Sequence, residues 1–151
     1  MTQDSGGPFD RRDQTSGKTL RLRSLSPALT VADVEASLVW YRDIVGFHVQ
    51  EKWEHEGKVG GAALIAGLGP LLLVQDDWAQ GRDREKGVGF RLHMTTAHDV
   101  DELAAAIEAR GGTLESPPED MPWGARAFSL VDPDGYKITI ASEGGTSGAS
   151  D

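Results

Sequence analysis

Residues 31–47, VADVEASLVWYRDIVGF, contain the signals that decide the fold. Asp33 can begin a helix, because its carboxylate accepts hydrogen bonds from amide groups that the first turn leaves unpaired. An apolar face at helical spacing follows, made by Val34, Leu38, Tyr41 and Val45. Gly46 is the residue type that closes a helix in a left-handed conformation. The stretch therefore predicts the end of one strand, a helix with one buried face, and the start of a second strand.

The landmarks of this stretch recur 66 residues later, which indicates an internal repeat. The repeated pairs are Asp33 and Asp99, Gly46 and Gly112, and Gly69 and Gly135. In the first copy we expect strands at 25–31, 47–53, 59–66 and 71–75. In the second copy we expect strands at 88–95, 113–116, 125–131 and 136–141, with a loop at 117–124. The sequence thus predicts an α+β fold of two tandem βαβββ units, at about 22–76 and 86–142, joined by a charged linker.

Length and composition limit the class of protein. The chain has 151 residues, which favours one domain. It carries a net charge of −9 and no cysteine, which argues against nucleic-acid or anionic-membrane partners and excludes thiolate metal sites. We expect disordered tails at 1–20 and 144–151 around one domain at 21–143. No apolar run has the length of a signal peptide or a membrane span, so a cytoplasmic protein is expected.

Two groups of motifs resemble the vicinal oxygen chelate superfamily, which includes glyoxalase I, extradiol dioxygenases, fosfomycin-modifying enzymes and bleomycin resistance proteins. The first group lies in Val31–Phe47 and contains Trp40-Tyr41-Arg42-Asp43. The second group, Pro122–Arg126 followed by Phe128–Gly135, is similar to the end of the bleomycin resistance type. The resemblance implies a curved, cup-like mixed sheet around a cavity, the glyoxalase/bleomycin resistance fold.

Enzymes of this superfamily hold a divalent metal with His, Glu or Gln side chains. The resemblance maps the ligand positions onto Ser26, Leu73, Gly89 or Leu92, and Thr139. A catalytic divalent cation needs about three or four imidazole or carboxylate ligands, and these residues supply none. We therefore expect no metal or other cofactor. His93 is next to one mapped position, and a shift of one residue would bring it there.

Several residues are candidates for contacting a ligand. Arg91 and His93 alternate with the apolar residues of strand 88–95, so they face the cavity if the apolar side packs on the helices. A histidine there can act as an acid, a base or a hydrogen-bonding group. Aromatic side chains in loops can clamp flat ligands. The full candidate set is Trp53, Arg91, His93, Trp123, Arg126 and Thr139.

Three functional hypotheses follow. The first is a metal-free protein of the bleomycin-resistance-like branch that binds and sequesters a planar or cationic compound. Acidic clusters at 54–56, 76–77 and 119–120 would form its negative rim. The second is a lyase, isomerase or dioxygenase with an atypical divalent metal site that includes His93. The third is a scaffold-like domain without pocket chemistry. A homodimer is expected, and the cavity could close within one chain or between two.

Overall fold

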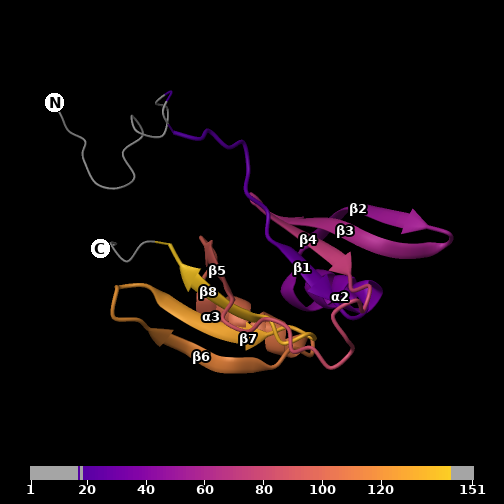
Figure 1. Ribbon diagram of the computed structural model, residues 1–151. Coiled ribbons are helices and arrows are strands. Elements are labelled where there is room, and N and C mark those ends of the chain that lie inside the picture. Colours follow the sequence, from indigo (N-terminus) through magenta and orange to yellow (C-terminus); the bar gives the residue numbers. More distant parts are fainter. Residues whose placement is uncertain (1–16, 18, 144–151) are drawn as a thin grey trace.

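The computed structural model describes residue 17 and residues 19–143 and shows two four-stranded sheets, each with its own helical segment (Figure 1). The tails expected at 1–20 and 144–151 lie outside the described residues, except for 17, 19 and 20. No helix in the described part of the chain is long and apolar enough to cross a bilayer.

The first unit has the predicted βαβββ order. Its elements are β1 (Ala28–Val31), α2 (Val34–Val39), the π-helix η1 (Trp40–Val45), β2 (His48–His55), β3 (Lys58–Ala66) and β4 (Gly69–Gln75). The strands lie in the order β1-β4-β3-β2, with β1 parallel to β4 and the other pairs antiparallel.

The second unit repeats this arrangement. Its elements are β5 (Arg91–Thr96), α3 (Val100–Ala109), β6 (Leu114–Asp120), β7 (Arg126–Val131) and β8 (Lys137–Ser142). The strand order is β5-β8-β7-β6, and β5 runs parallel to β8. The prediction of two tandem α+β units is therefore confirmed.

The helices begin where the sequence predicts. Asp33 accepts a hydrogen bond from the Ala36 N–H at 3.2 Å, and Asp99 caps α3 in the same way. After Val39 the first helix continues as the wider π-helix η1. At the end of η1, the Gly46 and Phe47 N–H groups both donate to the Tyr41 carbonyl. Gly46 then has φ 111°, the left-handed conformation predicted for it.

Three predicted boundaries are wrong by three residues or more. The strand expected at 25–31 begins only at Ala28. The loop expected at 117–124 begins later, because β6 continues to Asp120 through two prolines. An edge strand tolerates proline, and register shifts between 114 and 119 accommodate the missing N–H donors. The strand expected at 88–95 begins only at Arg91, since Gly89 adopts φ +70° and interrupts the extended conformation.

Each sheet has one face on the core and one face turned away from it. Alternate residues of β1, β3 and β4 pack with α2 and are almost fully buried, as are Phe128, Leu130, Ile138 and Ile140 of β7 and β8 on the side of α3. On the other side of β7 and β8, Ala127 and Ala141 are buried in a small cluster with Ala125 and Met121. We call the opposite sides the first open face and the second open face. The first open face contains Trp53, Gly61, Ala63, Leu72 and Val74. The second open face contains Arg91, His93, Ser129, Lys137 and Thr139.

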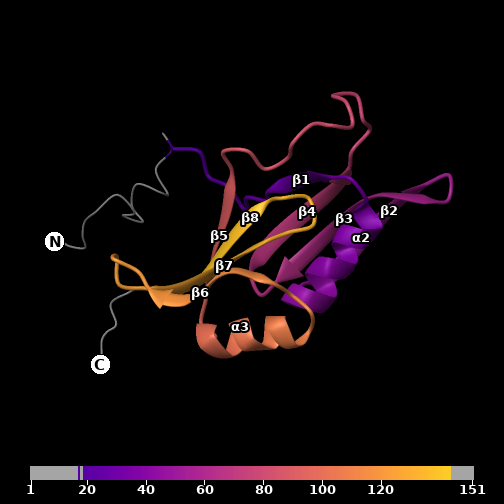
Figure 2. The same ribbon diagram turned by 90° about the horizontal axis from the view of Figure 1, so that it is seen from below.

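The two units share one core and meet at helices and a turn. The Tyr41 hydroxyl donates to Asp132 at 2.7 Å, from η1 to the β7–β8 turn. In that turn, Asp134 accepts a hydrogen bond from the Ala32 N–H at 2.9 Å. The Arg110 guanidinium donates to the Ile44 carbonyl at 2.9 Å. In Figure 2, α3 lies alongside β6 and β7, and α2 lies alongside β3. The Tyr136 hydroxyl also donates to the Thr30 carbonyl at 2.7 Å, so the joint reaches β1, at the edge of the first sheet farthest from β2.

Candidate functional site

The second open face brings three of the predicted ligand residues together. Strand pairing places Arg91 beside Lys137 and His93 beside Thr139, and Thr139 is also paired with Ser129 of β7. Directly paired residues point to the same side of a sheet. Leu92, on the other side, is buried in the core. The prediction that Arg91 and His93 face away from the packed side is therefore confirmed.

Hydrogen bonds connect the polar groups of the second open face. The Arg91 Nη1 group donates to Thr139 Oγ1 at 2.8 Å. The hydroxyls of Ser116 and Ser129 lie 2.6 Å apart, and Ser129 also donates to Glu115 at 3.3 Å. Hydroxyl, guanidinium and imidazole groups thus lie next to one another on three adjacent strands, where they can bind a polar substituent of a ligand.

The first open face carries an exposed tryptophan beside apolar residues of β3 and β4, with Glu51 and His48 on the same side of β2. The Trp53 side chain is 45% exposed, and Val74 on the same face is 43% exposed. The Trp53 ring lies over Gly61, where a Cβ would come within 2.9 Å of a ring carbon. The β2 strand has a register shift between Val49 and Glu51, so Trp53 leaves the side on which Val49 packs. An indole on an exposed apolar face can stack on a flat ligand.

Arg126 and Trp123 lie elsewhere. The Arg126 guanidinium reaches α3 and donates to Asp101 at 2.8 Å, and it also pairs with Asp120 at 3.1 Å. These carboxylates raise the pKa of Arg126. Trp123 lies in the β6–β7 connection and is 61% exposed. The structure does not bring Arg126 together with Arg91, His93 and Thr139.

The mapped metal positions do not fit a divalent cation. Leu73 is fully buried and Leu92 is 8% exposed, both on the packed sides of their sheets. Gly89 has no side chain, and Ser26 and Thr139 offer only hydroxyls. No group of three or more His, Cys, Asp or Glu residues close enough to hold a metal occurs in the described part of the chain. The donor set therefore lacks the ligands that such a metal requires.

The constant repeat spacing of 66 fails at the last strand of each unit. It pairs Leu73 with Thr139, yet Leu73 faces the core and Thr139 lies on the open face. The cause is the preceding turn. Residues 67–68 connect the paired Ala66 and Gly69 in the first unit, whereas the turn of the second unit spans 132–136. The longer turn changes the register, so Leu72 and Val74 are the residues of β4 on the open side.

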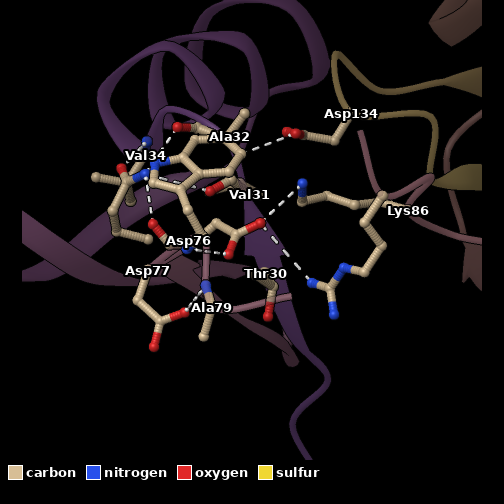
Figure 3. Close-up of polar contacts among 12 residues, drawn as sticks. Thr30, Val31, Ala32, Val34, Asp76, Asp77, Ala79, Lys86 and Asp134 are labelled. Atoms are coloured by element: carbon tan, nitrogen blue, oxygen red, sulfur yellow. Dashed lines mark hydrogen bonds and ion pairs between the residues drawn. The ribbon is translucent and has the colours of Figure 1, made fainter. Parts of the chain in front are cut away.

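The linker is anchored by the buried carboxylate of Asp76, which the sequence predicts in an acidic rim (Figure 3). Asp76 accepts a hydrogen bond from the Trp78 N–H at 2.8 Å and pairs with Lys86 at 3.0 Å. The Lys86 ammonium lowers the pKa of Asp76. Arg82 lies over the Trp78 ring, 4.4 Å from its centre. A pocket of about 330 Å³ lies between this linker and β1, lined by Ala28, Thr30, Arg84, Glu85, Lys86, Gly87, Val88 and Tyr136.

Three carboxylates of the acidic clusters are engaged in local contacts, whereas Glu54, Glu56 and Glu119 are exposed. Asp76 is paired with Lys86, and Asp77 caps the linker by accepting from the Ala79 N–H at 2.8 Å. Asp120 is paired with Arg126. These carboxylates are therefore engaged in local structure.

A duplicated βαβββ unit, with one helix-packed face and one open face per sheet, defines the class of protein. A family model described as "Glyoxalase/Bleomycin resistance protein/Dioxygenase superfamily" matches residues 23–140. The chain belongs to this superfamily.

Known relatives agree with this membership. A Synechocystis protein named "Probable lactoylglutathione lyase" is 28% identical over 123 residues, covering 77% of this chain and 92% of its own length. A similarly named Arabidopsis thaliana protein is 26% identical over 135 residues, covering 85% of this chain. The chain spans less than half of the plant relatives, 38% of the Arabidopsis protein and 45% of one from Brassica oleracea.

Solved structures show the same fold. A superfamily member from Sphaerobacter thermophilus has a TM-score of 0.64 and 26% identity, covering 82% of this chain and all of its own. TioX from Micromonospora has a TM-score of 0.66 and 21% identity, covering 78% of this chain and 96% of its own.

Proposed function

We propose that this chain is a metal-free binding protein, of the bleomycin-resistance-like kind, that sequesters a planar small molecule on its open faces. The observation that carries this proposal is the pair of sheet faces that no helix of the described residues covers. One presents an exposed indole on apolar surface, and the other presents Arg91, His93 and Thr139. Ligand sites commonly combine apolar walls with a few polar groups that fix orientation. The open-side residues Leu72 and Val74 of β4 and Thr139 of β8 carry no imidazole or carboxylate, which supports binding without a metal.

A second copy of the chain completes the site in this proposal. The first open face exposes Trp53 and Val74 together, and contiguous exposed apolar surface marks an interaction site. The joint between the units uses η1, α3, the β7–β8 turn and β1, and β1 lies at the edge of the first sheet farthest from Trp53 of β2. A homodimer that covers these faces would enclose the ligand between chains. Sedimentation velocity should give the mass of two chains, and a monomer at all concentrations would contradict this assembly.

Replacing Trp53 by alanine should weaken binding of planar compounds by about tenfold, because stacking on an indole contributes roughly 1 kcal/mol beyond area burial. Calorimetry with a panel of planar aromatic compounds, including bleomycin, measures the change. Leu68→Ala is the matched control, since Leu68 is exposed in the β3–β4 turn away from either face. Equal affinities in the two variants, or no binding by the parent protein across the panel, would contradict the proposal.

The second candidate is a lyase, isomerase or dioxygenase with an atypical divalent metal site, favoured by the names of the curated relatives. Its acid or base would be His93, which is exposed beside Thr139. The test is turnover of lactoylglutathione by the protein alone and with Zn²⁺, Mn²⁺, Ni²⁺ or Fe²⁺ added. A rate that requires the metal and falls in His93→Ala would establish this candidate over the binding protein.

A further inference from the structure

The β5 and β8 half of the second open face carries cationic side chains. The chain as a whole has 24 acidic and 15 basic side chains. In this half, however, Arg91 and Lys137 lie side by side on β5 and β8, and His93 is the next residue of β5 on the same side. The carboxylates of the face, Glu115 and Glu119, lie on β6 at the opposite edge of the sheet, and Glu115 reaches Lys137 through an ion pair of 3.4 Å. The charge beside β5 is therefore opposite to the net charge of the protein.

Arg91 is held in place without being neutralised. Its Nη1 group donates to Thr139, and within the described part of the chain no carboxylate forms an ion pair with it. Its Nε and Nη2 groups form no hydrogen bond within the same residues. These two groups make up one edge of the planar guanidinium, the edge that binds a carboxylate through two parallel hydrogen bonds.

We propose that the second open face binds a carboxylate group of the planar ligand, with Arg91 as the bidentate partner and Lys137 as a second cation. The inference rests on the proposed function and specifies the ligand class as anionic. It replaces the cationic ligand expected from net acidity, because Asp76 and Asp120 are engaged in ion pairs and the exposed charges on β5 and β8 of this face are positive. Thr139 is a positioning residue, since its hydroxyl accepts from Arg91 and fixes the plane of the guanidinium.

Three compounds of the same shape test this inference: 2-naphthoate, its neutral amide 2-naphthamide, and the cation 2-naphthylmethylammonium. Calorimetry at pH 7 gives the affinity of each for the full chain. We expect the carboxylate to bind about tenfold more tightly than the amide, as two charge-assisted hydrogen bonds would provide. The ammonium compound should bind least tightly.

Variants locate the effect. Arg91→Gln should abolish the preference for the carboxylate over the amide, and Lys137→Gln should reduce it. Thr139→Val keeps the shape and the Arg91 charge but removes the acceptor, so the preference should fall to an intermediate value. Lys58→Gln is the matched control, because it removes one positive charge from an exposed hairpin residue and should leave the preference unchanged. Circular dichroism confirms that each variant is folded.

The outcomes separate the inference from the proposed function. Equal affinities for carboxylate and amide would overturn the carboxylate site and leave the binding function intact. Tightest binding by the ammonium compound would overturn it in favour of a cationic ligand. A preference that survives Arg91→Gln would also overturn it. Absence of binding by all three compounds at their highest soluble concentrations would count against the inference and the proposed function together.

Discussion

Leu73→Glu should prevent the chain from folding stably. Leu73 is fully buried between β1 and β3, among the residues that pack with α2. A glutamate there would place an unpaired carboxylate in the apolar core, or would require the carboxyl group to take up a proton. We expect a loss of more than about 4 kcal/mol, comparable to the whole free energy of unfolding of a small domain. Urea unfolding followed by circular dichroism measures it.

Leu72→Glu is the matched control. Leu72 precedes Leu73 on β4 but lies half-buried on the first open face. The same substitution should therefore cost no more than about 1–2 kcal/mol. The comparison tests which of these two neighbouring residues of β4 faces the core. A stable Leu73→Glu protein that binds a divalent cation would contradict the register and the argument that the mapped positions cannot hold a metal.

Asp132→Ala should destabilise the protein by about 3 kcal/mol, because three hydrogen-bond donors lose the carboxylate that accepts from them. The Asp132 carboxylate accepts from the Tyr41 hydroxyl at 2.7 Å and from the N–H groups of Asp134 and Tyr136 at 2.8 and 2.9 Å. Tyr41 is fully buried, and desolvation raises its pKa, so its hydroxyl stays protonated and needs an acceptor. Thermal and urea unfolding at pH 7 measure the loss. A change below about 0.5 kcal/mol would show that this contact does not join the units.

Asp132→Asn separates hydrogen bonding from charge. Burial raises the pKa of Asp132, so the stability linked to its protonation is fully present below the ordinary value of 3.8. That contribution is lost as pH rises through the folded-state pKa. Because asparagine does not titrate, we expect the free energy of unfolding of the parent to fall relative to that of Asp132→Asn as pH rises above 3.8. A parent protein that gains stability relative to Asp132→Asn over this range would contradict the raised pKa.

Local signals were sufficient to predict most of the fold. Asp33 and Asp99 cap helices in the structure as their spacing predicts, and Gly46 closes the first helix. The errors occurred where tertiary context decides. Pro117 and Pro118 indicate a loop, yet an edge strand accommodates them because one side of its backbone needs no partner. The widening of the helix into a π-helix after Val39 has no signal of its own in the sequence.

The candidate site was predictable only where strict alternation holds. Leu92 and His93 lie on opposite sides of β5, as their neighbours indicate. Trp53 could not be assigned to a face, because register shifts in β2 interrupt the alternation. Arg126 was a candidate ligand residue because it belongs to the motif Pro122–Arg126. The direction of its side chain, however, depends on Asp101 of α3, which is distant in sequence. The ion pair between Asp76 and Lys86 likewise depends on how the linker folds back.

Metal content, measured together with ligand affinity, tests the central claim most directly. Elemental analysis should be made on protein purified without chelators or a metal-affinity column, and 2-naphthoate affinity should be measured before and after dialysis against a chelator. The proposed metal-free binding function predicts far less than one divalent ion per chain and the same affinity in both samples. About one tightly held ion per chain, with affinity or folding lost when it is removed, would contradict it and favour the enzyme.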